Sequence, residues 1–180
     1  PLHSQMPLPL DERLDALREF TSTSASREGT LVAIRAAGKV LSQRAVGLRH
    51  STGTSPLDRR PVFTYGDLHD YARDVIDHLF SIVDSAENEI DQAALEQLPT
   101  LVSELATQGR PKEALERLNK LVDWAVSEKP GVSVASLYRV IGFVRLSFLD
   151  RAQKQEIDAS RREEFQRHVE NLDRLISCLE

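Results

Sequence analysis

The sequence contains little cysteine and glycine, and this scarcity excludes several common kinds of protein. Cys178 is the only cysteine among 180 residues, so no disulfide can form within the chain. Small secreted domains usually depend on several disulfides, so we expect a reducing compartment and predict a cytoplasmic protein. The eight glycines are scattered, and none forms the spaced loop before a helix that cradles phosphate groups.

Long apolar segments and β-type alternation are also missing. The longest apolar stretch, about residues 132–149, contains Arg139 and Arg145, which argues against a membrane span. No sustained run alternates apolar and polar residues with Val, Ile and Thr enriched, so we expect no β-sheet. The net charge of −5 argues against the broad basic surface of most nucleic-acid-binding proteins.

Helical periodicity, by contrast, recurs along most of the chain. In the clearest segment, Val75 and Leu79 fall on one side of a helix, while Asp70 and Asp77 fall on the opposite side. We therefore predict an all-α fold of six to seven antiparallel helices, arranged as an irregular bundle or a short helical-repeat array. The expected helices cover about residues 11–20, 26–49, 64–84, 91–108, 111–128, 133–151 and 160–180.

Helix ends and one unusual helix can also be read from the sequence. Gly109 and Pro111 are typical of a helix that ends and another that begins. Ser160, with a glutamate three residues later, predicts a capping box that opens the last helix. The helix at 133–151 is apolar on nearly all sides, so we expect it to be buried on several sides, with Gly142 allowing another helix to approach closely.

The predicted domain organisation is simple. Residues 11–180 are expected to form a single helical domain, in which a loop at 50–63 separates the N-terminal helices from a helical-pair region at 64–180. Residues 1–10 are interpreted as an N-terminal extension or a remnant of cloning. Because the first residue is Pro1, the alternative is that the chain was cut from a longer protein.

Charge is distributed unevenly. Residues 25–61 contain seven Lys/Arg and two Asp/Glu, whereas residues 62–109 contain ten Asp/Glu and only Arg73 as a basic residue. These segments are either solvated faces that attract each other within the fold or surfaces for an external partner. The predicted partner-binding residues are Asp67, Asp70, Asp74, Asp77, Asp84, Arg35, Lys39, Arg59 and Arg60.

The stretch from Leu98 to Trp124 resembles a helix–turn–helix repeat of the tetratricopeptide kind. The positions that match the family's spacing of large, small, glycine and alanine residues are Leu98, Leu101, Val102, Leu105, Gly109, Ala114 and Leu118. The pattern departs from the family at Val102, which replaces a small residue, and at Pro111, which replaces an aromatic one. The closing proline also comes late, at Pro130.

A second partial match begins at Tyr138, 40 residues after Leu98, and this spacing is nearer to that of HEAT-type repeats. Pro99 inside a first helix is also common in HEAT repeats. The resemblance to both families covers mainly residues 98–142. It implies a stacked helical array that binds proteins or peptides along one surface. The resemblance does not identify any ligand-binding residue in this chain, because the matching positions are packing positions.

Candidate chemistry is sparse. His69 and His78 lie on a predicted helix rich in aspartate, but they are nine residues apart. That spacing puts them about 180° apart around the helix axis, so they cannot share a metal ion. Cys178 lies beside an apolar stripe near the end of the chain, where we interpret it as a packing residue and not as a nucleophile. We predict no catalytic residue, no metal and no cofactor.

These observations favour a protein–protein interaction or scaffold module, either complete or a fragment of a larger protein. Its partner would be another protein or a neighbouring domain of a longer chain. The alternative is a self-associating structural or accessory subunit, a homodimer, whose mark would be an apolar sixth helix left uncovered within one chain. An accessory nucleic-acid-binding domain ranks below both. We expect no enzyme activity and no membrane binding.

Overall fold

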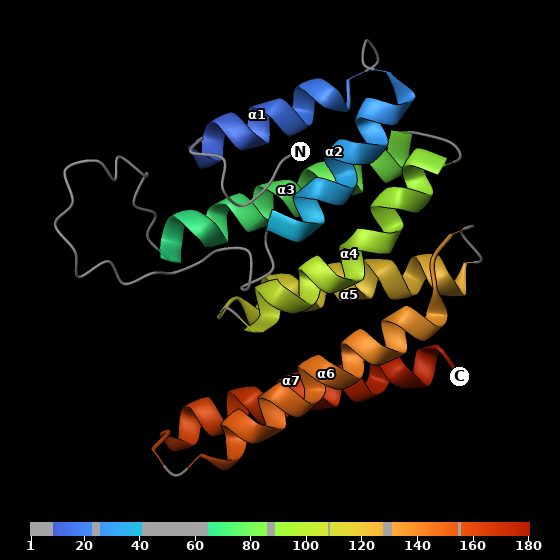
Figure 1. Cartoon of the computed structure of the whole chain (residues 1–180). Helices are drawn as coiled ribbons and strands as arrows, with labels where there is room; N and C mark the ends of the chain where they lie inside the picture. The colour runs from blue at the N-terminus through green and yellow to red at the C-terminus, as the bar shows by residue number, and fades with distance from the viewer. Residues whose placement is uncertain are drawn as a thin grey trace, which may run out of the picture. The chain divides into compact units, whose positions relative to one another are not determined.

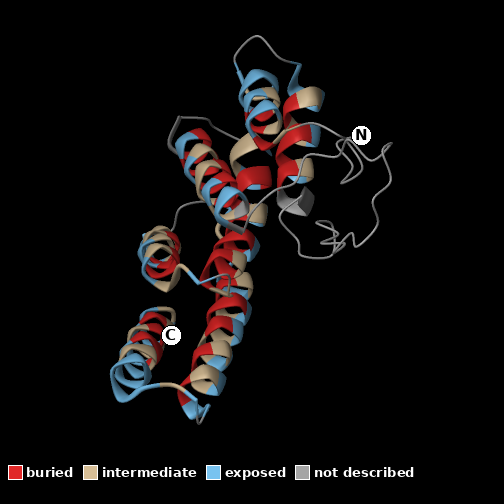
Figure 2. Ribbon diagram, turned by 90° about the vertical axis from the view of Figure 1, so that its left-hand side faces the viewer, coloured by how far each residue is buried: buried red, intermediate tan, exposed pale blue. Residues whose placement is uncertain are grey.

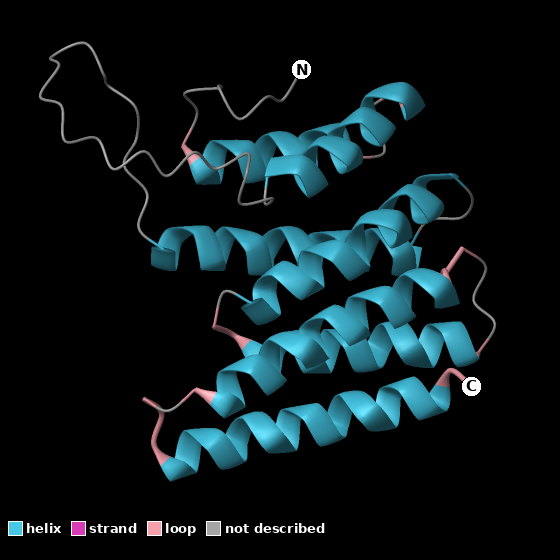
Figure 3. Cartoon of the chain, turned by 60° about the horizontal axis from the view of Figure 1, so that its bottom comes forward, coloured by secondary structure: helices cyan, strands magenta, loops and turns pink. Residues whose placement is uncertain are grey.

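The computed structural model describes residues 9–22, 26–40, 65–85, 89–107, 109–127, 131–154 and 156–180, with the backbone alone at 38–40, 65, 68, 84 and 85. Every regular element in these ranges is an α-helix (Figure 3), which confirms the predicted all-α fold. The helices are α1 (Leu10–Phe20), α2 (Arg27–Val40), α3 (Tyr65–Ser85), α4 (Glu89–Thr107), α5 (Pro111–Val126), α6 (Val134–Gln153) and α7 (Ala159–Cys178). The helix expected at 26–49 is observed as far as Val40, while residues 41–49, residue 64 and the predicted loop at 50–63 lie outside the described ranges.

The chain forms two compact units, Pro1–Gln97 and Leu98–Glu180, so the boundary falls inside α4. We call them the N-terminal unit and the C-terminal unit and describe each by itself. The prediction of one domain over residues 11–180 stays a prediction.

In the N-terminal unit, α1 packs against both α2 and α3. The apolar side of α3 supplies Val75, Ile76 and Leu79, and α2 supplies Ile34; all four side chains are fully buried. They occupy positions that the three-and-four spacing places on one side of each helix. Burial of these apolar side chains holds the unit together.

In the C-terminal unit, α6 lies along α7, and α5 packs against both (Figure 1). The inner side of α6 contributes Leu137, Ile141, Val144 and Phe148, which are fully buried. Phe148 stacks on Phe165 of α7, with the ring centroids 5.9 Å apart. These contacts make the pair of α6 and α7 the main packing interface of this unit.

The turn between α4 and α5 has the predicted glycine and proline. Gly109 has a φ of 101°, a conformation that side chains with a Cβ rarely adopt. The N–H of Arg110 donates to the carbonyl of Leu105, five residues earlier, at 3.3 Å; this is the long bond of a Schellman turn. Pro111 begins α5, where its missing N–H would have no helical partner.

Two arginines of the C-terminal unit cap the carbonyl ends of neighbouring helices. Nη2 of Arg151 donates to the carbonyl of Thr107, the last residue of α4, at 2.6 Å. Nε of Arg162 donates to the carbonyl of Ala152, near the end of α6, at 3.2 Å. The last carbonyls of a helix lack helical donors and carry partial negative charge, so both cations stabilise these ends.

The start of α7 corrects one prediction. Ser160 is not the capping residue, because the helix already begins at Ala159. The cap is Asp158, which has an extended backbone and accepts a hydrogen bond from the N–H of Arg161 at 2.8 Å. A carboxylate at this position satisfies a free N–H and also interacts favourably with the positive end of the helix.

Replacing Gly109 with alanine should destabilise the chain by about 1–2 kcal/mol, because a residue with a Cβ is strained at positive φ. No atom lies within 4 Å of the position that a Cβ would take, so backbone strain is the expected cause. Gly142, in the middle of α6, is the matched control and also has open space there. Gly142→Ala should stabilise the helix by about 1 kcal/mol. Urea unfolding measures both, and a neutral Gly109→Ala variant would contradict the described turn.

Candidate functional site

The outer side of α6 exposes two large apolar side chains. Phe143 is 57% exposed and Leu146 is 64% exposed, although the opposite side of the same helix is fully buried. The prediction that this helix is buried on several sides is therefore wrong: α6 packs on one side only, and Figure 2 shows this division of the helices by colour. Large apolar side chains that remain next to one another in water mark a candidate interaction site.

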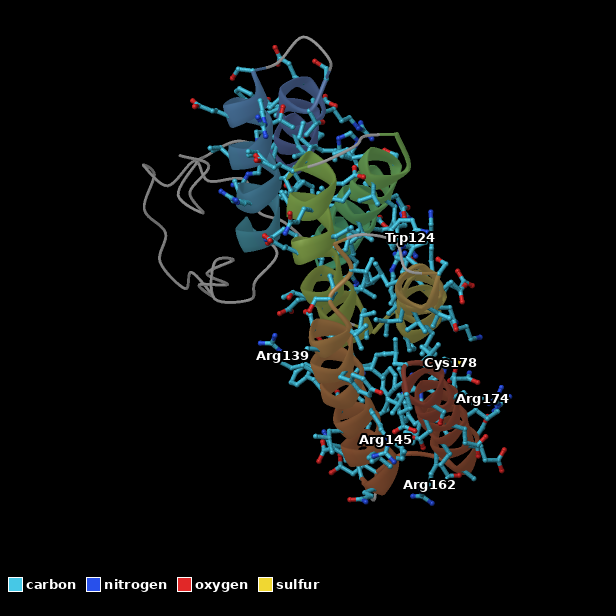
Figure 4. All side chains as sticks on the ribbon, turned by 90° about the vertical axis from the view of Figure 1, so that its right-hand side faces the viewer. Trp124, Arg139, Arg145, Arg162, Arg174 and Cys178 are labelled. Atoms are coloured by element: carbon cyan, nitrogen blue, oxygen red, sulfur yellow. The ribbon has the colours of Figure 1, made fainter. Side chains whose placement is uncertain are left out.

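Charged residues flank this apolar pair along the helix. Arg139 precedes it and Asp150 follows it, and both are exposed. Figure 4 shows Arg139 pointing away from α7, whereas Arg145 points toward it. Four exposed residues make up what we call the α6 outer face: Arg139, Phe143, Leu146 and Asp150.

Arg145 and Arg139 have different roles in the fold. Nε of Arg145 lies 2.5 Å from Oδ1 of Asp173, and Nη2 lies 3.4 Å from Oδ2, so a guanidinium on α6 faces a carboxylate on α7. Two parallel contacts of this kind orient both side chains. No described residue forms an ion pair with Arg139. Arg145 thus joins the two helices, while the charge of Arg139 is available to a partner.

The predicted acidic surface lies on α3. Asp67, Asp70 and Asp77 are exposed, and Asp74 is partly buried. The guanidinium of Arg73 lies 3.3 Å from Asp70 and 3.0 Å from Asp74, so part of this negative charge is balanced within the helix. Exposed pairs of this kind contribute little to stability. The partner-binding role of these aspartates stays a prediction.

The other predicted partner-binding residues are only partly described. Arg35 is exposed on α2. Lys39 and Asp84 lie in α2 and α3, but their side chains are outside the description. Arg59 and Arg60 lie outside the described residues altogether. The partner-binding role of these basic residues stays a prediction.

Changing Asp70, Asp74 and Asp77 to asparagine should alter the free energy of unfolding by less than about 1 kcal/mol. Losing the two pairs with Arg73 is offset by relief of repulsion between like charges three and four residues apart. If this face binds a basic partner, the same variant should bind it more weakly, and the loss should shrink at high salt. A destabilisation above about 2 kcal/mol would instead mean that the aspartates hold structural contacts.

His78 of α3 contacts a residue at the end of α1. Nε2 of His78 lies 2.7 Å from the hydroxyl of Thr21, so this ring links α3 to the end of α1. Burial lowers the pKa of His78, and the nearby Arg18 lowers it further. The described ranges hold no group of three or more His, Cys, Asp or Glu side chains placed to bind a metal ion. Within the same ranges, no helix has both the length and the apolar character to cross a bilayer.

His168 is a buried polar residue that our sequence analysis missed. It lies on α7 with its ring 5.4 Å from that of Phe148. Nε2 has no hydrogen-bond partner among the described residues, and Oε1 of Glu164 lies 3.8 Å from it. Burial lowers the pKa of its imidazole; Glu164 opposes this shift, while Lys112 and Arg167 add to it. It lies three residues after Phe165, a spacing that places it on the apolar side of α7. Because histidine is polar, its residue type alone suggests that the side chain is exposed to solvent.

We expect stability to fall as the pH is lowered from about 7.5 to about 5.5, and His168→Phe to reduce this loss. The pKa of His168 is lower in the folded chain than in the unfolded chain, so protons bind preferentially to the unfolded state and favour unfolding. The pKa of His78 is lowered too, so some pH dependence should remain. Urea unfolding at both pH values measures the effect. Equal pH dependence in the variant and the parent would show that His168 can ionise where it lies.

Cys178 also differs from its prediction. We interpreted it as a packing residue, but its side chain is exposed at the C-terminal end of α7. The apolar stripe of α7 passes through Val169, Leu172 and Leu175, and Cys178 follows it by three residues without being covered. Its thiol therefore contributes little to the core.

No protein-family model, curated protein or solved structure matches the chain. The resemblance of residues 98–142 to tetratricopeptide and HEAT-type repeats stays a prediction. Function is therefore inferred from the side chains that the fold leaves exposed.

Proposed function

We propose that this chain is a protein-interaction module that binds its partner through the α6 outer face. The observation that carries this proposal is the exposure of Phe143 and Leu146 in the middle of α6. Covering one such side chain contributes roughly 1.5–3 kcal/mol, so a partner that buries both would gain appreciable affinity. The charged residues at the two ends would fix the partner's orientation, as charges at the rim of an interface commonly do.

The fold supports this use of α6. The inner side of the helix is anchored by fully buried residues such as Ile141 and Phe148, so the outer face belongs to a helix that is held in place. A surface ordered before binding loses less conformational entropy when a partner docks. The resemblance to helical repeats favours the same function, since such arrays bind proteins along one surface. A cytoplasmic location is part of the proposal, because a lone cysteine suits a reducing compartment.

Site-specific photo-crosslinking tests this proposal. A benzophenone amino acid placed at position 143 should give a discrete protein adduct in cell extract. The same group placed at Val32, which is 58% exposed on α2, provides the matched control. We expect adducts from position 143 and not from position 32, and we expect Leu146→Ser to weaken them. Equal labelling from both positions, or no protein adduct either in cell extract or with the concentrated chain alone, would reject the proposed function.

A further inference from the structure

The α6 outer face has the spacing of a helix-pairing stripe. Its residues follow one another at steps of four, three and four, from Arg139 through Phe143 and Leu146 to Asp150. At 100° per residue they span an arc of about 60° of the helix surface. This is the spacing with which helices of a coiled coil contact each other. The stripe is thus suited to a second helix that lies nearly parallel or antiparallel to α6.

The order of residues along the stripe is complementary to itself. If a second α6 runs antiparallel, with the midpoint of both helices between Val144 and Arg145, Phe143 lies level with Leu146 of the other copy. In the same register Arg139 lies level with Asp150, so each apolar contact and each charge pair occurs twice. A two-fold interface requires this reciprocity, in which one residue meets a second and the second meets the first.

The charges also select the direction of the second helix. In a parallel arrangement Arg139 would face Arg139 and Asp150 would face Asp150, and like charges at an interface are costly. In the antiparallel arrangement both pairs attract. Within one copy, Asp150 lies 3.8 Å from Lys154, with both side chains largely exposed, and such a pair is weak enough for Arg139 of another copy to compete with it.

We propose that the α6 outer face binds the same face of a second copy of this chain, in antiparallel register. This inference rests on the proposed function, since it names the partner of the same surface. The stripe is short compared with the roughly 800 Å² per partner of a typical stable interface, so a dissociation constant on the order of 10–100 µM is expected.

Sedimentation equilibrium of the full chain at about 5–300 µM tests this proposal, using variants in which one charged residue is replaced by a residue of opposite charge. Arg139→Asp and Asp150→Arg, each alone, should raise the dissociation constant at least about tenfold, since each places two like-charge pairs in the dimer. An equimolar mixture of the two variants should restore association, because both pairs then attract again. Arg174→Asp on α7, which changes an exposed charge away from the stripe, should have no effect.

A second variant tests the apolar contact. Phe143→Ser combined with Leu146→Ser should leave the chain monomeric at all these concentrations, with its helical circular dichroism unchanged because both residues are exposed. A parent chain that stays monomeric would overturn the self-pairing, as would a dimer that is insensitive to Arg139→Asp. A mixture that fails to associate would overturn the antiparallel register. If these tests fail while position 143 still crosslinks to another protein, the proposed function stands and only its partner changes.

Discussion

Replacing Phe148 with alanine should lower the free energy of unfolding by about 3–5 kcal/mol. Phe148 is fully buried in the C-terminal unit. Its ring stacks on Phe165 at 5.9 Å between centroids and also contacts the ring of His168 at 5.4 Å. The substitution removes the apolar contacts and leaves a cavity between α6 and α7, and both effects destabilise the folded chain.

Guanidinium chloride unfolding, followed by circular dichroism, measures this loss. Leu146→Ala is the matched control, since Leu146 lies on the same helix two residues away but is 64% exposed. Its cost should be below about 0.5 kcal/mol at a concentration where the chain is monomeric. If both variants lost the same stability, the assignment of inner and outer sides of α6 would be wrong.

Replacing Ile141 with alanine should cost about 2–5 kcal/mol. Its side chain is fully buried on the inner side of α6, one helical turn from Leu137 and close to Val144 in the sequence. The inner side of α6 packs against α5 and α7, so the cavity cannot close without moving a helix. Urea unfolding again measures the effect.

A graded pair of substitutions makes this prediction sharper. Ile141→Val removes a single methylene and should cost about 0.5–1.5 kcal/mol, which lies well below the cost of Ile141→Ala. A loss below about 1 kcal/mol for the alanine variant would place Ile141 at the edge of the core, in conflict with its burial.

The sequence was sufficient to predict where most helices lie and which side of α3 is buried. Steps of three and four placed Val75 and Leu79 inward, and both are buried. The turn at Gly109 was also predictable, because few residues other than glycine tolerate its positive φ. These features depend on neighbours within one helix or one turn, and that information is local.

The exposure of α6 could not be predicted in the same way. Phe143 and Leu146 are as apolar as the buried residues of that helix. An apolar side chain is more stable when buried, but its residue type does not indicate which element, if any, buries it. Only the positions of α5 and α7 show that one side of α6 remains open. His168 was missed for the converse reason. Histidine is often exposed to solvent, but this one is buried beside Phe148 in the core.

The exact first residue of a helix was also not predictable from the local pattern. Ser160 with its following glutamate fits the capping-box spacing, but Asp158 lies two residues earlier and provides an acceptor of its own. Both residue types are good caps, so residue type alone does not decide which of them begins α7. The backbone of Asp158, which is extended in the structure, decides between them.

The exposed thiol of Cys178 makes the chain suitable for distance spectroscopy without further mutation. It is the only cysteine of the sequence, so one nitroxide can be attached per chain at a known position. Cys178 lies on α7, which packs on the inner side of α6, so a label there would leave the α6 outer face uncovered. A two-fold pair of labelled chains contains one spin–spin distance, whereas head-to-tail stacking of copies generates a series of them. A single pulsed dipolar measurement would therefore report the symmetry of the assembly.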